Sequence, residues 1–235
     1  MSLIWAASGA VIGLPAGSSL RGPVASLSVR SGEPPQLGCR DCAAPMPGLI
    51  AIRCPACGRW FGPTAAIEVL TAAVLALLAG RFGATPDLAA FAYLGVLGVA
   101  LALIDADVQR LPDPLTLSGY PAMIALLAAA ALADSSGAAL GRALLAGLAL
   151  ATGYLALGLL SRGQLGGGDI KLAGLVGLAL GWVGWQAVVL GACLGFVLAA
   201  AGNLMLLAAR RVSVRSMVSF GPYMLAGALL AILVY

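Results

Sequence analysis

Residues 88–117 read LAAFAYLGVLGVALALIDADVQRLPDPLTL, and this stretch decides the class of fold. No charged side chain occurs from residue 88 to residue 104, and Asp105, Asp107 and Asp113 follow soon after. A helix needs roughly 20 predominantly apolar residues to cross the hydrocarbon core of a bilayer. We therefore expect a membrane-spanning helix here, with acidic residues where it ends at one membrane face.

The same apolar character extends over most of the 235 residues. Hydrophobic residues make up 61% and charged residues 9%, whereas a soluble domain usually has about 25% charged residues. Long uncharged runs predict an all-α polytopic membrane protein with about eight transmembrane helices in the lipid bilayer. The expected helices cover residues 1–20, 63–80, 88–104, 114–133, 143–160, 170–183, 185–207 and 217–235.

The lysines and arginines predict how these helices are oriented, because cytoplasmic loops collect basic residues. With alternating spans, Arg81 and Arg142 lie on one side and all the other basic residues on the opposite side. The opposite side should be cytoplasmic, which places both termini outside. The net charge of +4 then reflects topology, and we expect no nucleic acid partner. The residues on the cytoplasmic side are Arg21, Arg30, Arg40, Arg53, Arg59, Arg110, Arg162, Lys171, Arg210, Arg211 and Arg215.

Two CxxC pairs lie in the first predicted loop, Cys39 with Cys42 and Cys54 with Cys57. Such pairs suit the tetrahedral coordination of zinc by four thiolates. Two disulfides are the alternative, which a reducing cytoplasm disfavours. We expect a structural zinc that organises a loop too small to form a core of its own. The predicted parts are a first transmembrane helix (1–20), a cytoplasmic four-cysteine zinc-binding loop (21–62) and a seven-helix membrane core (63–235).

The chain contains no histidine, which restricts the chemistry that it can perform. The Ser/His/Asp triad, the Cys/His dyad and the two-histidine zinc protease motif all need an imidazole. No GxxxxGK[ST] phosphate loop occurs either, so ATP-driven transport by this chain is not expected. Hydrolysis by this protein would have to use other groups.

Two aspartates stand out because both are expected at the same membrane face. Asp105 ends one apolar run, and Asp169 opens another in LGGGDIKLAGL, residues 165–175. Two spans separate them, so they emerge on the same side. A lone aspartate at a helix end is usually a loop residue or a cap. Two carboxylates brought close together share a proton and divide into one base and one acid, which can activate water without histidine or metal.

The motifs around these aspartates are specific, and at this point the chain resembles a known family. One motif matches the GxGDxK motif of the GxGD membrane aspartic proteases, and the segment after Asp105 is similar to the first-aspartate motif of the type IV prepilin peptidases. The segments AIEVLTA (66–72) and SFGPY (219–223) are also similar to stretches of that family. The matching residues are Gly166, Gly168, Asp169 and Lys171 in the first motif and Leu111, Pro112 and Asp113 in the second.

The resemblance implies a membrane-embedded aspartic endopeptidase with Asp105 and Asp169 as its catalytic dyad. Its substrate would be a type IV prepilin or pseudopilin, whose basic leader is cleaved after a glycine at the cytoplasmic face of the bacterial inner membrane. Glu68, Asp107 and Asp113 are candidates to contact that leader.

The resemblance also implies N-methylation of the new N-terminus with S-adenosylmethionine as cofactor. The stretch after the first helix that should contain an asparagine reads GSSLRGPVASLSVR, without one.

Two other classes of function remain open from the sequence. A secondary transporter or channel with a zinc-stabilised cytoplasmic loop also uses membrane-embedded acids, but its site should lie near the bilayer midplane. Here the acids gather at one face, which favours an enzyme that meets its substrate from the cytoplasm. A pseudoenzyme or assembly scaffold is the third reading.

Overall fold

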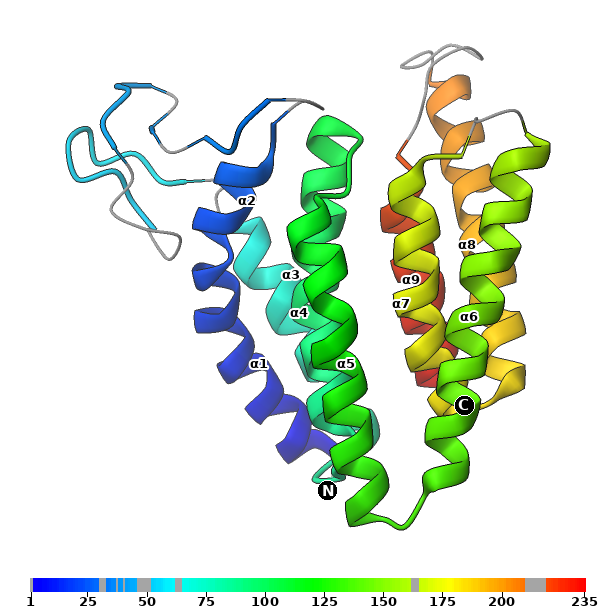
Figure 1. Ribbon diagram of the computed structural model, residues 1–235. Coiled ribbons are helices and arrows are strands. Elements are labelled where there is room, and N and C mark those ends of the chain that lie inside the picture. The colour runs from blue at the N-terminus through cyan, green and yellow to red at the C-terminus, as the bar shows by residue number, and fades with distance from the viewer. Residues whose placement is uncertain are drawn as a thin grey trace. The chain divides into compact units, whose positions relative to one another are not determined.

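The computed structural model describes residues 2–29, 33–36, 38–39, 41–45, 52–61, 65–161, 165–209 and 219–235. Their regular structure is helical, and the only β-bridges among these residues are two isolated ones in the Cys-rich loop (residues 28–65). The predicted all-α class is therefore confirmed. The helices are α1 (Ser2–Ser19), α2 (Arg21–Leu27), α3 (Ala66–Phe82), α4 (Leu88–Val108), α5 (Asp113–Ala133), α6 (Gly137–Leu160), α7 (Gly167–Val183), α8 (Trp185–Ala208) and α9 (Gly221–Val234) (Figure 1).

Four described helices, α4, α5, α6 and α8, are long and apolar enough to cross a membrane. A fifth span results if α1 and α2 are taken together across their bend of about 40°. These spans make the chain a multi-pass membrane protein. Helices α3, α7 and α9 have 17, 17 and 14 residues, fewer than the roughly 20 of a full crossing. The count of about eight spans therefore stays a prediction.

Several helix boundaries differ from the predicted runs for one physical reason. A charged residue ends an apolar run in the sequence, but it does not interrupt the backbone hydrogen bonds of a helix. Thus α4 continues beyond residue 104 to Val108, and α6 begins at Gly137 and includes Arg142. The run 1–20 is followed directly by the short helix α2, which the sequence reading left in the loop. The predicted starts of two helices, residues 63–64 and 217–218, lie outside the described residues.

The chain divides into two compact units, Met1–Arg110 and Leu111–Tyr235. In the first unit α1 runs antiparallel to α3 at very short range, because glycines of α1 lie directly on the α3 backbone. A Cβ atom at Gly13 would clash with the Cα of Ala72. Helix α3 also packs on α4, and the rings of Phe82 and Phe91 stack there at a centroid distance of 4.3 Å. The glycine contacts between α1 and α3 are typical of helices packed in membranes.

In the second unit α7 is the central helix, and its residues from Leu172 to Trp182 are buried. It contacts α5, α6, α8 and α9, and Figure 1 shows it in yellow among these helices. Arg142 of α6 closes the carboxyl end of α7: its Nε and Nη2 donate to the carbonyls of Gly181 and Trp182 at 2.7 and 2.6 Å. A cation at a helix carboxyl end is stabilised by the helix dipole.

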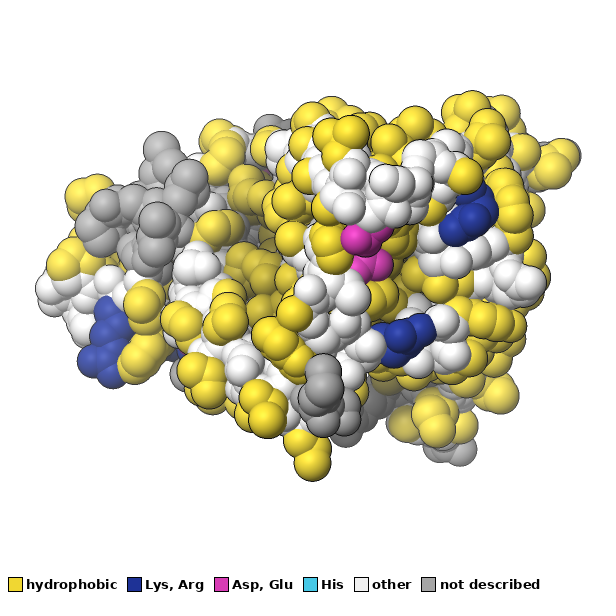
Figure 2. All heavy atoms as spheres, turned by 90° about the horizontal axis from the view of Figure 1, so that it is seen from below, with side chains coloured by type: hydrophobic (Ala, Val, Ile, Leu, Met, Phe, Trp, Pro, Cys, Tyr) yellow, Lys and Arg dark blue, Asp and Glu magenta, His cyan; other side chains and the backbone are white. Residues whose placement is uncertain are grey.

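The surface carries many large apolar side chains. Figure 2 shows a face on which hydrophobic side chains dominate and charged ones are few. Leu3, Leu132 and Leu160 are more than three-quarters exposed, at 84%, 85% and 80%. Exposed apolar area on this scale is the expected covering of helices that face lipid.

Candidate active site and metal centre

Asp105 lies inside the last turns of α4 and not beyond its end. Its residue is only 5% exposed. The helix stops a turn later, where Gln109 adopts a left-handed conformation (φ 52°, ψ 41°) and its N–H donates to the Asp105 carbonyl at 2.8 Å. Because successive residues of a helix are about 100° apart, Asp107 points about 200° away from Asp105. Asp107 is accordingly exposed, so the two neighbouring aspartates have different environments.

Asp169 lies in the first turn of α7, and two of the three glycines before it have identifiable roles. Its Oδ2 atom lies over Gly166, where an added Cβ would be 3.2 Å away, and its N–H donates to the Gly166 carbonyl at 3.0 Å. Gly168 faces Leu111, whose Cβ would be 2.8 Å from a Cβ at this position. An added Cβ at Gly167 would meet open space. The pattern GxG therefore corresponds to two close contacts with an unconstrained residue between them.

The segment that follows Asp105 in the chain packs on the start of α7. Leu111 is buried against Gly168, and Lys171 Nζ contacts Asp113 Oδ1 at 2.6 Å. The Tyr120 hydroxyl of α5 donates to the Lys171 carbonyl at 2.6 Å. The Lys171–Asp113 pair is partly exposed, and such pairs contribute only about 0–1 kcal/mol. We infer that this pair aligns the two motifs and adds little to stability.

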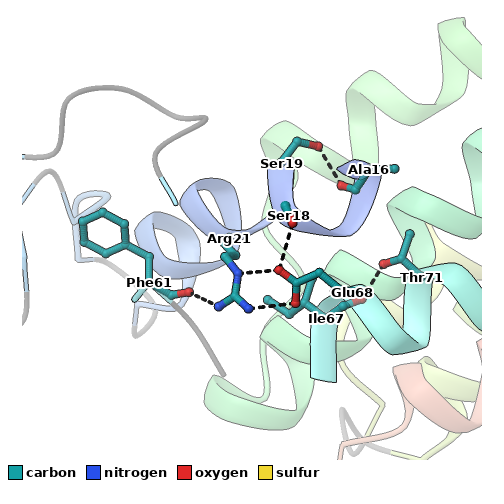
Figure 3. Close-up of polar contacts among 8 residues, drawn as sticks. All are labelled: Ala16, Ser18, Ser19, Arg21, Phe61, Ile67, Glu68 and Thr71. Carbon is teal, nitrogen blue, oxygen red and sulfur yellow. Dashed lines mark hydrogen bonds and ion pairs between the residues drawn. The ribbon is translucent and has the colours of Figure 1, made fainter. Parts of the chain in front are cut away.

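A buried ion pair joins the first residue of α2, Arg21, to Glu68 in the first turn of α3. Arg21 is bidentate to Glu68, with Nε–Oε1 and Nη2–Oε2 distances of 2.6 and 2.7 Å (Figure 3). Ser18 also donates to Glu68, at 3.0 Å, and the Arg21 Nη1 donates to the Phe61 carbonyl at 2.9 Å. The two charged side chains are 3% and 14% exposed. The sequence reading missed this role of Arg21, because its partner is far away along the chain.

The structure places the predicted leader-contacting acids in three different settings. Glu68 is held by Arg21 and Ser18, Asp113 by Lys171, and Asp107 is exposed on the last turn of α4. A role in binding the leader stays a prediction for all three. For Glu68 it would require breaking the ion pair with Arg21.

The four predicted ligands converge at one point. Their sulfur atoms all lie within 4.8 Å of one another, with Cys39–Cys57 at 3.7 Å and Cys42–Cys54 at 3.5 Å. Four sulfurs at about 2.3 Å from a zinc ion would be separated by about 3.8 Å. A disulfide needs about 2.05 Å, so these cysteines are free thiols. The predicted four-cysteine cluster is confirmed, and its donor set and spacing fit tetrahedral zinc.

Backbone N–H groups donate hydrogen bonds to sulfur atoms of this cluster and lower the pKa values of those cysteines. The N–H of Cys57, with that of Ala56, bonds the Cys54 sulfur and lowers the pKa of Cys54 to about 7. At Cys42 the N–H of Ala44 lowers the pKa, but the sulfurs of Cys54 and Cys57 outweigh it and raise the pKa to about 12. Turns whose N–H groups point at a sulfur favour its thiolate form, which is the form that binds metal. The Cys54 thiol therefore ionises near neutral pH, whereas the Cys42 thiol would lose its proton when a cation binds.

The comparisons with known proteins agree with this arrangement. A profile of the type IV leader peptidase family matches residues 92–234, a region that contains Asp105, Leu111, Asp113, Asp169 and Lys171. A curated prepilin leader peptidase/N-methyltransferase from Pseudomonas putida is 32% identical over 168 residues. That similarity covers 71% of this chain but 57% of the relative, so the chain spans less than two thirds of the relative's length. No solved structure matches the chain. The extent of the family match shows that this chain belongs to the type IV leader peptidase family.

Proposed function

We propose that this protein is a prepilin leader peptidase, a membrane-embedded aspartic endopeptidase that cleaves the leader from type IV prepilins or pseudopilins. The observation that carries the proposal is the contact between its two motifs, in which Leu111 packs on Gly168 and Asp113 pairs with Lys171. This contact holds Leu111 and Asp113 against the first turns of α7, where Asp169 lies. Family membership favours this function over a transporter or channel.

In the proposed mechanism Asp105 and Asp169 act as one dyad that shares a proton. The ionised carboxylate takes a proton from water as the water oxygen attacks the scissile carbonyl carbon. The protonated carboxyl group donates its proton to the carbonyl oxygen. The resulting diol then collapses: the ionised carboxylate takes a proton from one hydroxyl as the C–N bond breaks, and the protonated carboxyl group gives its proton to the leaving nitrogen, which restores the singly protonated dyad. The burial of Asp105 supports this role, because exclusion of water strengthens the electrostatic interactions that stabilise charge in the transition state.

The proposal gives zinc a structural role and places the reaction at the cytoplasmic face of the bacterial inner membrane. Cys39, Cys42, Cys54 and Cys57 would hold the ion with no coordination position left for substrate. The orientation rests on the distribution of lysine and arginine. The name of the relative includes N-methyltransferase. For this chain, N-methylation with S-adenosylmethionine as cofactor stays a prediction.

The test is cleavage of a prepilin by the purified protein in lipid nanodiscs, with the products identified by mass spectrometry. Asp105→Asn and Asp169→Asn should each abolish cleavage while the protein remains inserted and folded. Asp107→Asn should retain cleavage, because Asp107 points away from Asp105. Asp134→Asn is the control, since Asp134 is exposed at the α5–α6 turn. Robust cleavage by the Asp169→Asn protein would overturn the proposal.

The same assay decides the methylation question. Added S-adenosylmethionine should increase the mass of the mature product by one methyl group if the chain is a methyltransferase. An unchanged mass, with cleavage intact, would limit the activity to the peptidase reaction.

A further inference from the structure

The hydroxyl group of Tyr120 reaches from α5 to the backbone of α7. It donates a hydrogen bond to the Lys171 carbonyl at 2.6 Å, and the N–H of Leu175 bonds the same hydroxyl oxygen. A helix joins the carbonyl of one residue to the N–H of the residue four positions later, and Lys171 and Leu175 have this spacing. The Tyr120 hydroxyl therefore lies beside one rung of the α7 hydrogen-bond ladder and contacts both of its groups.

Gly174 provides the space that this hydroxyl occupies. A Cβ atom at position 174 would clash with the Tyr120 hydroxyl, and it would lie 3.2 Å from the Cβ of Ala151. Alanine is more favourable than glycine inside a helix, so helix formation gives no reason for a glycine at this position. The close approach of the Tyr120 hydroxyl does give one. All these residues belong to the second unit, so the contact is internal to it.

Helix α5 holds Lys171 a second time, through the lysine side chain. Lys171 Nζ contacts Asp113 Oδ1 at 2.6 Å. Asp113 and Tyr120 are seven residues apart, which places them on the same face of α5. The side-chain pair is partly exposed and therefore weak. The bond from the half-buried Tyr120 to a backbone carbonyl acts directly on the path of α7.

This backbone bond is close to Asp169 along the chain. Asp169 lies two residues before Lys171, in the first turn of α7, and its N–H donates to the Gly166 carbonyl at 3.0 Å. A side chain that bonds to the hydrogen-bond ladder of a helix bends the helix at that point. The Tyr120 hydroxyl thus sets the direction in which the first turn leaves the buried part of α7, which begins at Leu172.

We propose that Tyr120 is a positioning residue for Asp169: its hydroxyl, seated over Gly174, fixes the first turn of α7 and with it the direction of the Asp169 carboxylate. The inference rests on the proposed function and extends it to a residue outside the aspartyl dyad. Tyr120 acts through the α7 backbone and takes no part in the proton transfers. A misplacement of about 1 Å lowers the rate of an enzyme about 100-fold, so the loss of this bond should be visible in kcat.

The bond can be measured directly, because Lys171 is the only lysine of the chain. Lysine that carries ¹³C at its carbonyl carbon labels this carbonyl alone, and the infrared frequency of a carbonyl rises when it loses a hydrogen bond. Tyr120→Phe removes the hydroxyl, keeps the ring and should raise this frequency. Tyr93→Phe is the matched control, because the hydroxyl of the half-buried Tyr93 makes no hydrogen bond with the described residues. An unchanged frequency in Tyr120→Phe would overturn the inference.

Cleavage kinetics in nanodiscs test the functional role. Tyr120→Phe should lower kcat for a prepilin about tenfold and leave KM unchanged, because the reacting group moves and the surface that binds the substrate does not. Tyr93→Phe should leave both constants unchanged. A wild-type kcat in Tyr120→Phe, or a change confined to KM, would overturn the inference while leaving the peptidase function in place. A wild-type protein that cleaves no prepilin would overturn the proposed function and the inference with it.

Gly174→Ala separates positioning from stability. By itself this substitution should displace the Tyr120 hydroxyl, lower the unfolding temperature and reduce kcat as much as Tyr120→Phe does. In the double variant the hydroxyl is gone, so the unfolding temperature should be higher than in Gly174→Ala alone, while kcat stays at the level of Tyr120→Phe. Recovery of kcat together with the unfolding temperature would assign Tyr120 a structural role only and would overturn the inference.

Discussion

Gly168 and Leu111 are so close that the glycine cannot carry a side chain without moving its neighbour. A Cβ at position 168 would be 2.8 Å from the Leu111 Cβ, whereas position 167 has nothing within 4 Å. This difference explains why one glycine of the motif is demanded by packing and the adjacent glycine is not. The contact matters for function because Asp169 is the next residue in the chain.

The first prediction compares alanine substitutions at these two glycines. Gly168→Ala should destabilise the protein by about 1–3 kcal/mol through overpacking and should lower the cleavage rate strongly. Gly167→Ala should change both little. The double variant Gly168→Ala with Leu111→Gly should lose less stability than the sum of the two single variants, because only glycine at position 111 removes the Cβ atom that would clash. Thermal unfolding in detergent and cleavage kinetics are the measurements, and an equal effect of the two alanines would contradict the packing argument.

The second prediction concerns the buried ion pair of Arg21 and Glu68. Removing one member leaves an uncompensated buried charge, which costs about 3–5 kcal/mol. Arg21→Met and Glu68→Gln should therefore each lower the unfolding temperature markedly, and the double variant should lose less than the sum of the two. The exposed pair offers the contrast: Asp113→Asn should cost only about 0–1 kcal/mol. Additive losses in the Arg21 and Glu68 variants would show that the two residues do not act as a pair.

At the scale of structural elements, the Cys-rich loop has a very small hydrophobic core, so its structure depends on a few contacts. Its described residues form two turns whose small core consists of Cys39, Cys54 and Phe61, with Ala25 of α2 and Ala44 packed against it. So little buried area cannot fix a loop by itself, and structural zinc provides such loops with their folding energy. Zinc binding and loop structure are therefore expected to be lost together.

The third prediction is the metal content of the loop and its dependence on pH. One zinc per chain should be present, should be lost when Cys39 and Cys42 become serine, and should remain in Cys193→Ser. Because the pKa of Cys42 is raised to about 12, zinc must displace a proton there. Cys54, with its pKa lowered to about 7, also takes up a proton as the pH falls below neutral. Zinc affinity should therefore weaken on acidification, as measured by competition with a chromophoric chelator, and a pH-independent affinity would contradict this.

At the scale of the whole molecule, basic residues lie at both ends of the helices of each unit, and the two ends belong to opposite predicted sides of the membrane. In the first unit Arg21, the first residue of α2, pairs with Glu68 in the first turn of α3, whereas Arg81 lies in the last turn of α3. In the second unit Lys171 lies at the start of α7, and Arg142 binds the carbonyls at its end. Both divisions agree with the assignment of Arg81 and Arg142 to the external side. Arg30, Arg40, Arg162, Arg210, Arg211 and Arg215 lie outside the described residues.

The fourth prediction tests this orientation with reporter insertions. Alkaline phosphatase, which is active only outside the cytoplasm, should be active when inserted in the α3–α4 turn or the α5–α6 turn. The same enzyme should be inactive when inserted in the Cys-rich loop. The α7–α8 turn at Gly184 provides an internal check, because it should behave like the α5–α6 turn. Activity in the Cys-rich loop would reverse the topology and would place the cysteines where disulfides form.

The sequence by itself determined the membrane class, the helical fold and the four-cysteine cluster. A bilayer tolerates only backbones that satisfy their own hydrogen bonds, so composition and run length already imply helices. The spacing of two CxxC pairs limits how four sulfurs can meet, so their convergence was predictable. The family motifs likewise lie in short, continuous segments. Helix ends were less predictable, as at α4 and α6, because charge ends an apolar run without ending a helix.

Only the tertiary structure decided which residues hold these motifs in place. Arg21 and Glu68 are 47 residues apart, and Asp113 and Lys171 are 58 residues apart, so no local pattern pairs them. The contact of Gly168 with Leu111 and a cavity beside Asp107 likewise arise from segments distant in the chain. Periodicity and spacing describe neighbours along a helix or turn, whereas these contacts depend on how helices pack. Packing is therefore what distinguished Asp107, which lines a cavity, from Asp113, which is bound to Lys171.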